Sequence, residues 1–432
     1  HTGLAQYNNA HFSPATGRIY LLSDEGRNIM NRAEIDLMAP SPKVTFVEET
    51  PWDAEEMTLS DDGRLMAWVT NEDGYSKLHL ENLVTHTELL TPPILPEGVI
   101  YSLAFSRDGK ELAFVVNAPT FNGDIWMYDI EDQSYWQVTH SSRGGVPQGT
   151  FVKPQLVRYK SFDGRQIPAY LYTPNMAGRT QGLPVIFSLH GGPEGQERPY
   201  FDGVYQYFLN HGYAIFAPNI RGSTGYGKEY THADDIEKRW DALKDIAAGV
   251  DYLKQSGYAN PKKIVVMGGS YGGFASLASV TFYPDLWAAG IDLFGIANFK
   301  TFLQNTGAWR RKFREAEYGY LDKNAEFLAK ISPVNSIQNV KVPMFIWQGA
   351  NDPRVPKGES DQMVDGLKAR GIPVEYMVAD DEGHGISKLA NRIKTYRAIV
   401  AFLDQYLKSA PASSSAPPAP SLASSPALSP LP

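Results

Sequence analysis

The pattern of apolar and polar positions changes character near residue 150 of this 432-residue chain. Before that point, short segments alternate apolar with polar residues, as strands with one buried face do, and turns rich in Asp and Gly separate them. After it, near-continuous apolar runs take turns with helical patterns, which is typical of a parallel sheet covered on both faces. The pattern therefore predicts a β-rich region followed by an α/β region.

Three segments of the β-rich region resemble one another. Each carries a serine just before a turn, at Ser13, Ser60 and Ser106, and these serines recur about every 46 residues. This period is typical of propeller blades, so each unit is expected to form four antiparallel strands. Residues 1–150 are predicted to form a partial β-propeller of about three blades. Because three blades do not close a ring, and His1 opens no signal-like segment, further residues are expected upstream, making the amino terminus a truncated one.

Residues 151–408 are predicted to form an α/β-hydrolase fold, which is a doubly wound and mostly parallel sheet. A hairpin opens this region at residues 156–172. The buried strands are expected at residues 184–189, 213–218, 264–267, 289–294, 342–347 and 374–378, and helices at 241–255, 272–279, 358–369 and 391–407. The last segment, residues 409–432, contains only Ser, Ala, Pro and Leu and is predicted to be a disordered tail.

A candidate nucleophile lies between the third of these strands and the helix that follows it. Residues 268–272 read Gly-Gly-Ser-Tyr-Gly, which fits the GxSxG pattern. A tight strand-to-helix turn of this kind exposes the serine hydroxyl at the carboxyl edge of the sheet and needs small neighbours. GxSxG also occurs in ordinary glycine-rich turns, but the flanking strand and helix favour the catalytic interpretation of Ser270.

A serine hydroxyl is a weak nucleophile, so it needs a base that an acid holds in place. In this fold the three residues follow in the order Ser, acid, His. Asp352 and His384 meet that order, and each follows a predicted strand at the edge where Ser270 lies. The acidic residues next to the histidine, at positions 380–382, are expected to serve as a solvated turn instead.

Acyl transfer also needs donors for the negative oxygen of the tetrahedral intermediate. The main-chain amide of Tyr271, directly after the nucleophile, is the first candidate. The second is expected from the loop after the strand at residues 184–189, which reads His-Gly-Gly-Pro, and we choose Gly192 within it. An ordinary Gly/Pro turn is the alternative for this loop.

Six short motifs together resemble the prolyl oligopeptidase family of serine peptidases. They are HGGP, NIRGSTGYGK, GGSYGGF, EAEYG, GANDPRVP and DEGHG, and they occur in the family's order. The resemblance covers residues 1–408 and is greatest to the bacterial acylaminoacyl-peptidase and dipeptidyl-peptidase-like branch. It implies a serine peptidase that hydrolyses short peptides through an acyl-enzyme intermediate. Whether it cuts within a chain or from an end stays open.

The resemblance also implies substrate-binding residues. Arg354, two residues after the candidate acid, matches the position of an arginine that holds a substrate carbonyl in the family, with a surface arginine as the alternative. Aromatic residues between the nucleophile and the acid are expected to form an apolar pocket, and we choose Trp309 and Phe299, although aromatics at helical spacing are also typical of a core.

Family members that remove dipeptides bind the substrate ammonium with an acidic pair in the propeller. The pairs at residues 48–49 and 55–56 are expected to lie on a solvated face instead.

Composition excludes several other classes of function. The net charge of −8 comes without a basic stripe, which argues against nucleic acid as a partner, and no apolar run is long enough to insert into a membrane. The absence of cysteine removes thiolate catalysis and Cys-ligated metal, and no metal or other cofactor is predicted. Short peptides are the expected partners, self-association is left open, and both cytoplasm and periplasm remain compatible. A carboxylesterase or lipase, and a non-catalytic propeller-based binding protein, are the alternative functions.

Overall fold

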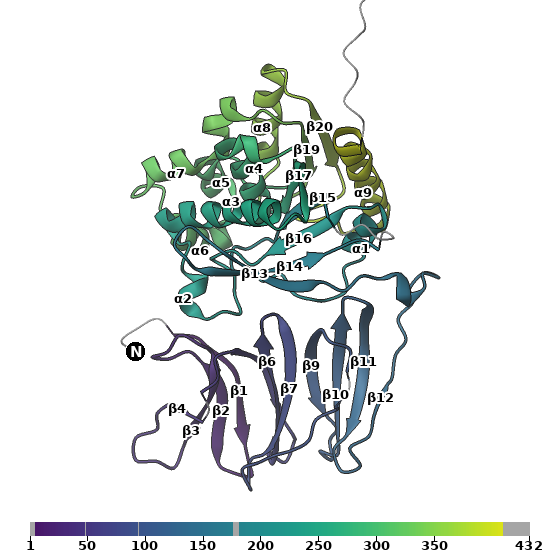
Figure 1. The fold of residues 1–432 in the computed structure, drawn as a ribbon. Helices are drawn as coiled ribbons and strands as arrows, with labels where there is room; N and C mark the ends of the chain where they lie inside the picture. Colours follow the sequence, from purple (N-terminus) through teal and green to yellow (C-terminus); the bar gives the residue numbers. More distant parts are fainter. Residues whose placement is uncertain (1–4, 48, 94, 176–180, 409–432) are drawn as a thin grey trace, which may run out of the picture.

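The computed structural model describes residues 5–47, 49–93, 95–175 and 181–408, and Figure 1 shows two stacked parts. Three four-stranded antiparallel sheets come first along the chain and lie side by side. An eight-stranded sheet with helices on both faces follows them. The segment predicted to be a disordered tail, residues 409–432, lies outside the described residues.

Each of the three small sheets is built from consecutive strands. The first contains β1 (Tyr7–Ser13), β2 (Arg18–Ser23), β3 (Asn31–Asp36) and β4 (Thr45–Phe46). The second contains β5 (Asp53–Leu59), β6 (Leu65–Glu72), β7 (Tyr75–Asn82) and β8 (Thr87–Glu88). The third contains β9 (Val99–Phe105), β10 (Glu111–Ala118), β11 (Phe121–Asp129) and β12 (Tyr135–Gln137). The prediction of four antiparallel strands in each repeat is therefore confirmed.

The serines of the second and third repeats bond within their own turns. Ser60 donates to a carboxylate oxygen of Asp62 (2.7 Å) and accepts from the main-chain N–H of Leu65 (3.0 Å). Ser106 makes the same bond to Asp108 (2.7 Å) in the third sheet. A side chain that bonds to its own turn replaces ladder hydrogen bonds where the strand must stop, so the serine and the aspartate together define the hairpin.

The eight-stranded sheet is mostly parallel. Its strands, in spatial order, are β13 (Gln155–Lys160), β14 (Gln166–Tyr172), β16 (Ala214–Pro218), β15 (Leu183–Leu189), β17 (Ala259–Gly269), β18 (Ala289–Leu293), β19 (Met344–Gly349) and β20 (Val374–Ala379). The pairs β13–β14 and β14–β16 are antiparallel, and all later pairs are parallel. A 3-10 turn, Gln148–Thr150, precedes the sheet.

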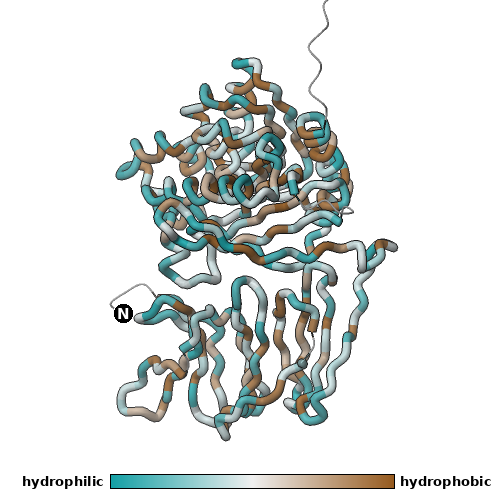
Figure 2. The backbone as a smooth tube through the Cα atoms, in the orientation of Figure 1, coloured by the Kyte–Doolittle hydropathy of each residue, from teal (hydrophilic) through white to brown (hydrophobic). Residues whose placement is uncertain are grey.

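The sheet is buried on both faces, as the apolar runs predicted. Along β15, Val185 and Phe187 pack into one hydrophobic cluster and Ile186 into the other, because successive strand residues point to opposite faces. Figure 2 shows apolar residues concentrated along these strands and the inner sides of the helices. The predicted doubly wound, mostly parallel sheet is confirmed.

The helices divide between the two faces. One face packs against α3 (Arg239–Gln255), α4 (Tyr271–Phe282), α5 (Phe299–Asn305), α7 (Ala325–Ile331) and α8 (Gly358–Ala369). The other packs against α1 (Gly203–Asn210) and α9 (Leu389–Leu403), which continues as a short π-helical segment, Asp404–Lys408. The remaining helices are α2 (Lys228–Thr231), α6 (Ala308–Tyr318) and the 3-10 segments Ile236–Lys238, Pro284–Leu286 and Pro333–Asn339. No helix among the described residues combines the length and apolar character that crossing a membrane requires.

Polar contacts join the small sheets to the larger part. Arg198 forms an ion pair with Glu55 (2.6 Å) and donates to the carbonyl of Gly74 (2.8 Å). Gln196 accepts from the side-chain amide of Asn71 (2.6 Å). The segment before α1 is therefore fastened to the second sheet.

The acidic pairs of the small sheets differ from the expected solvated faces. Glu55 is partly exposed but forms the ion pair just described, and Glu56 accepts from the main-chain N–H groups of Ser102 (2.9 Å) and Leu103 (2.7 Å). The solvated interpretation of residues 55–56 is thus corrected, since both side chains hold neighbouring elements together. Glu49 is 86% exposed, as expected, and Glu48 lies outside the described residues.

Candidate active site

Ser270 lies on the sharp turn between β17 and α4. Its backbone has φ 59° and ψ −116°, a conformation that L-residues rarely adopt. A side chain at Gly268 would place a Cβ atom 2.3 Å from the carbonyl oxygen of Gly272, and one at Gly272 would come 2.1 Å from that of Leu189. The glycines of GxSxG are therefore needed for close backbone packing, which holds the strained serine in place.

The structure brings the two expected partners to this serine. Nε2 of His384 lies 2.9 Å from Ser270 Oγ, and Nδ1 of His384 lies 2.6 Å from a carboxylate oxygen of Asp352. The other carboxylate oxygen accepts from the main-chain N–H groups of Arg354 (2.8 Å) and Val355 (3.0 Å). Because the Nδ1–H group donates a hydrogen bond to the buried carboxylate, Nε2 is left unprotonated and acts as the base toward the serine hydroxyl.

The neighbouring acids are engaged elsewhere. Asp380 is exposed, and Asp381 forms an ion pair with Lys388 (2.7 Å). Glu382 is only 2% exposed and accepts from the main-chain N–H of Lys388 (2.8 Å), so for this residue the prediction of a solvated turn was wrong. None of them takes the place of Asp352 beside the histidine.

The loop at residues 190–193 lies against the nucleophile. A Cβ atom at Gly191 would come 3.5 Å from that of Ser270. The carbonyl of Gly192 accepts from Arg314 Nη1 (3.1 Å) and from the hydroxyl of Tyr318 (3.3 Å), both on α6. Side chains of α6 therefore hold this loop in position. The role of the Gly192 and Tyr271 amides as oxyanion donors stays a prediction.

Beneath the turn, three acidic residues come close enough together to bind an ion: Asp234, Asp235 and Glu317. Arg239 already pairs with Asp234 and Glu317. Asp234 also accepts from the Tyr271 hydroxyl (3.1 Å). Because the guanidinium already occupies Asp234 and Glu317, we interpret these three residues as a buried ion-pair network that supports the residue after the nucleophile.

A cavity of about 630 Å³ opens at Ser270. Its lining includes His384, Gly192 and Arg354, together with Glu197 and Arg392. This is a typical volume for a small-molecule or peptide-segment site. The predicted serine, base and arginine therefore share one cavity.

The two aromatic candidates for a substrate pocket do not line this cavity. Phe299 is fully buried and packs against Phe274 and Tyr318, so its predicted substrate contact was wrong and it is a core residue. Trp309 is 67% exposed on α6 and stays a prediction. Sequence spacing alone did not distinguish these two environments.

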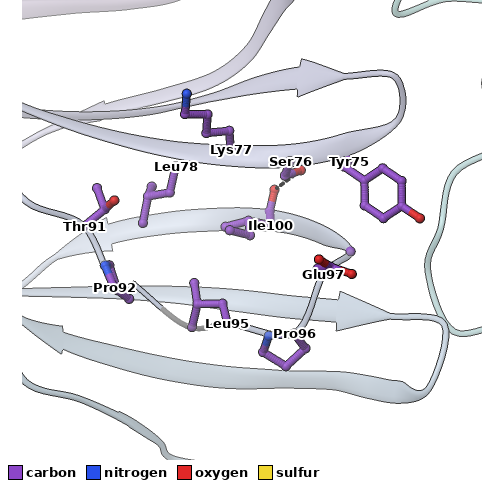
Figure 3. Close-up of a pocket in the computed structure, with 11 residues that line it drawn as sticks. Tyr75, Ser76, Lys77, Leu78, Thr91, Pro92, Leu95, Pro96, Glu97 and Ile100 are labelled. Carbon is purple, nitrogen blue, oxygen red and sulfur yellow. Dashed lines mark hydrogen bonds between the residues drawn. The ribbon is translucent and has the colours of Figure 1, made fainter. Parts of the chain in front are cut away.

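A second cavity, of about 550 Å³, lies among the small sheets (Figure 3). Lys77, Glu97 and several prolines and leucines line it, and Ser76 donates to the carbonyl of Ile100 (3.5 Å). No histidine is found among the described residues that line this cavity. The cavity at Ser270 is consequently the candidate for chemistry.

Comparison with known proteins agrees with the motifs. Residues 199–410 match the sequence profile of the prolyl oligopeptidase family. These residues belong to the prolyl oligopeptidase family. The chain is also similar to dipeptidyl aminopeptidase BIII of Pseudoxanthomonas mexicana, at 35% identity over 60% of this chain and 40% of that protein. It is 31% identical to dipeptidyl peptidase family member 6 of Caenorhabditis elegans, over 72% of this chain and 48% of the relative.

Solved structures of the same architecture show how far the likeness extends. A puromycin-hydrolyzing peptidase of Mycobacterium tuberculosis superposes with a TM-score of 0.84 at 22% identity, over 93% of this chain and 62% of that one. The likeness shows that the large sheet and its helices form an α/β-hydrolase fold of the prolyl oligopeptidase type. The chain spans less than half the length of the two relatives named above.

Proposed function

We propose that this chain is a serine peptidase that hydrolyses peptide bonds of short peptides through an acyl-enzyme. The observation that carries the proposal is the continuous set of short contacts from Ser270 to His384 to Asp352, of which the serine and the histidine line one cavity. The names of the relatives, a dipeptidyl aminopeptidase and a dipeptidyl peptidase family member, support peptides as the substrate class.

In the proposed mechanism, Ser270 Oγ attacks the carbonyl carbon while its proton passes to Nε2 of His384. The oxyanion accepts hydrogen bonds from the main-chain N–H groups of Tyr271 and Gly192. His384 then gives the proton to the leaving amine as the C–N bond breaks, and an acyl-serine ester remains. Water attacks this ester with His384 as base, which releases the acid and restores the serine.

Two further features are proposed to serve the same reaction. Arg354 lines the cavity, and its guanidinium forms no ion pair among the described residues, so it is free to donate to a substrate carbonyl. The three small sheets, residues 5–150, are proposed to be blades of a propeller that restricts access to the cavity. Their contacts with residues 196 and 198, close to the cavity wall, support this placement.

The test is covalent labelling combined with turnover. We expect a fluorophosphonate to modify Ser270, and Ser270→Ala to abolish both labelling and peptide hydrolysis. Ser256→Ala, at the exposed end of α3, is the matched control and should behave as wild type. Undiminished peptide hydrolysis by Ser270→Ala would contradict the mechanism, and turnover of esters without peptides would favour a carboxylesterase.

A further inference from the structure

Glu197 lies in the segment before α1 and lines the same cavity as Ser270 and His384. It is only 7% exposed. Its side chain accepts one hydrogen bond, from the hydroxyl of Tyr205 (3.2 Å), and forms no ion pair with any described residue. A buried carboxyl group with a single neutral donor is under-satisfied, because an ionised carboxylate can accept about four hydrogen bonds.

The backbone around this carboxyl group is firmly held. The side-chain oxygen of Asn219 accepts from the main-chain N–H of Glu197 (2.6 Å), and its amide nitrogen donates to the Glu197 carbonyl (3.0 Å). The neighbouring side chains, Gln196 and Arg198, bind the second small sheet instead. Glu197 is thus fixed with its side chain in the cavity while its neighbours face the sheets.

The surroundings of Glu197 are acidic and aromatic. Asp202 lines the same cavity and accepts from two main-chain N–H groups at the start of α1. Burial, followed by the charge of Asp202, raises the pKa of Glu197 to about 8. Tyr200 and Tyr172 are the other titratable groups that interact with it, and Arg392 of α9 interacts with Asp202 rather than with Glu197.

A bound cation would allow Glu197 to ionise and would fill its unused hydrogen-bonding capacity. A buried carboxylate is stabilised when charge-assisted hydrogen bonds replace its lost hydration shell. An ammonium group supplies both the positive charge and three donors. The described part of the chain provides no cation to Glu197, so a cationic group of the substrate is the partner that fits this position. The shared cavity puts that partner on the same molecule that Ser270 attacks.

We infer that Glu197 binds an alkylammonium group of the peptide substrate, either its α-amino terminus or a lysine side chain. The inference rests on the proposed peptidase function. It assigns a specificity role to a residue outside the catalytic set, and it ties the recognition site to the segment that connects the two parts of the molecule.

The experiment compares matched neutral and cationic substrates. One arm uses Ala-Phe aminocoumarin amide with a free or an acetylated amino terminus. The other uses amino-terminally acetylated quenched peptides that carry lysine or norleucine at each position around the cut. We expect wild type to prefer the cationic member of one arm by about tenfold or more in kcat/KM, as expected for one charge-assisted hydrogen bond.

The variant Glu197→Gln keeps the shape but cannot ionise to pair with a bound ammonium group. We expect it to lose the preference while keeping its rate on the neutral member. Glu326→Gln removes an exposed carboxylate on α7 and should keep the wild-type preference. A preference that survives in Glu197→Gln, or the absence of any cation preference in wild type, would overturn the inference. Fluorophosphonate labelling separates this failure from failure of the proposed function, since labelling of Ser270 does not require Glu197.

A measurement on wild type alone covers the case in which Glu197→Gln does not fold. Hydrolysis of a neutral activated ester is followed with added n-butylammonium chloride or n-butanol. We expect competitive inhibition by the ammonium ion at concentrations where the alcohol has no effect. Equal effects of the two compounds would overturn the inference.

Discussion

Two buried carboxyl groups of the candidate active site are held in opposite ways. One carboxylate oxygen of Asp352 accepts from the histidine ring, and the other accepts from two main-chain N–H groups. Glu197, which lines the cavity, accepts from one tyrosine hydroxyl. We call His384 and the loop of Asp352 the complete wall of the site, because the Asp352 carboxylate is bonded at both oxygens. Glu197 is the incomplete wall, because it leaves hydrogen-bonding capacity unused.

The difference distinguishes a residue that positions the catalytic histidine from a residue proposed to recognise the substrate. A group that must orient another side chain needs all its lone pairs occupied, because that removes alternative orientations. A group that must bind a ligand needs vacant capacity and a rigid backbone, which Asn219 provides for Glu197. Changes to the two walls should consequently affect rate and specificity separately.

The largest expected effect comes from the complete wall. His384→Ala and Asp352→Asn should each lower kcat by roughly four orders of magnitude while the protein stays folded, as in other Ser-His-Asp enzymes. The asparagine fails because it cannot hold the imidazole in the required tautomer. Steady-state kinetics with circular dichroism as the folding control measures this. Wild-type activity in Asp352→Asn would move the acid to Asp380 or Asp381.

The buried carboxyl group of Glu197 should make the free energy of unfolding depend on pH. The pKa of Glu197 is raised by burial to about 8, whereas in the unfolded chain it returns near 4.5. Between these values the folded state keeps a proton that the unfolded state has lost, so this group makes the protein less stable as pH rises. The slope for one such group is at most about 1.4 kcal/mol per pH unit.

Glu197→Gln removes this contribution. The difference in unfolding free energy between the variant and wild type should therefore grow in favour of the variant as the pH rises from 5 to 8. At the slope given above, this growth amounts to a few kcal/mol. Urea unfolding at both pH values measures it, with Glu326→Gln as the control that shows no such gain. A constant difference between variant and wild type across the range would mean that Glu197 is already ionised in the folded protein.

The complete wall was predictable from sequence and the incomplete one was not. GxSxG has a fixed meaning because Gly268 and Gly272 are needed for the backbone approach, and the order of acid and histidine follows from the order of the parallel strands. Glu197 belongs to no motif. Its significance depends on Asn219, which is distant in sequence, and on which neighbours bind the small sheets.

Aromatic residues show a second limit of the sequence. Phe299 and Trp309 lie on the successive short helices α5 and α6, yet one is fully buried and the other is 67% exposed. Helical periodicity identifies an apolar face but does not say which of several layers will cover it. The pairing of Glu55 with Arg198 was hidden for the same reason, since it joins two parts of the molecule.

Arg354 tests whether the complete wall also contacts substrate. Arg354→Ala should lower kcat/KM for peptides by about tenfold, the worth of one charged hydrogen bond, and affect small activated esters less because they lack the distal carbonyl. Arg397→Ala, exposed on α9, is the matched control. Equal losses on peptides and esters would show that the arginine supports the loop of Asp352 instead of binding substrate.

The smallest expected effect concerns the loop at residues 190–193, which packs against the nucleophile turn. The carbonyl of Gly192 in this loop accepts from the Tyr318 hydroxyl and from Arg314. Removing one donor leaves a second in place, so Tyr318→Phe should lower kcat only several-fold with little change in KM.

The double variant Tyr318→Phe with Arg314→Met tests whether the two donors act together. It should lose more in kcat than the product of the single losses, because only then is the Gly192 carbonyl left without a side-chain donor. Tyr320→Phe, two residues further along the chain and partly exposed, removes the same hydroxyl without touching the loop and should match wild type. Purely multiplicative losses would mean that each donor acts on its own, and that the loop is held by the backbone packing of Gly191 against the nucleophile turn.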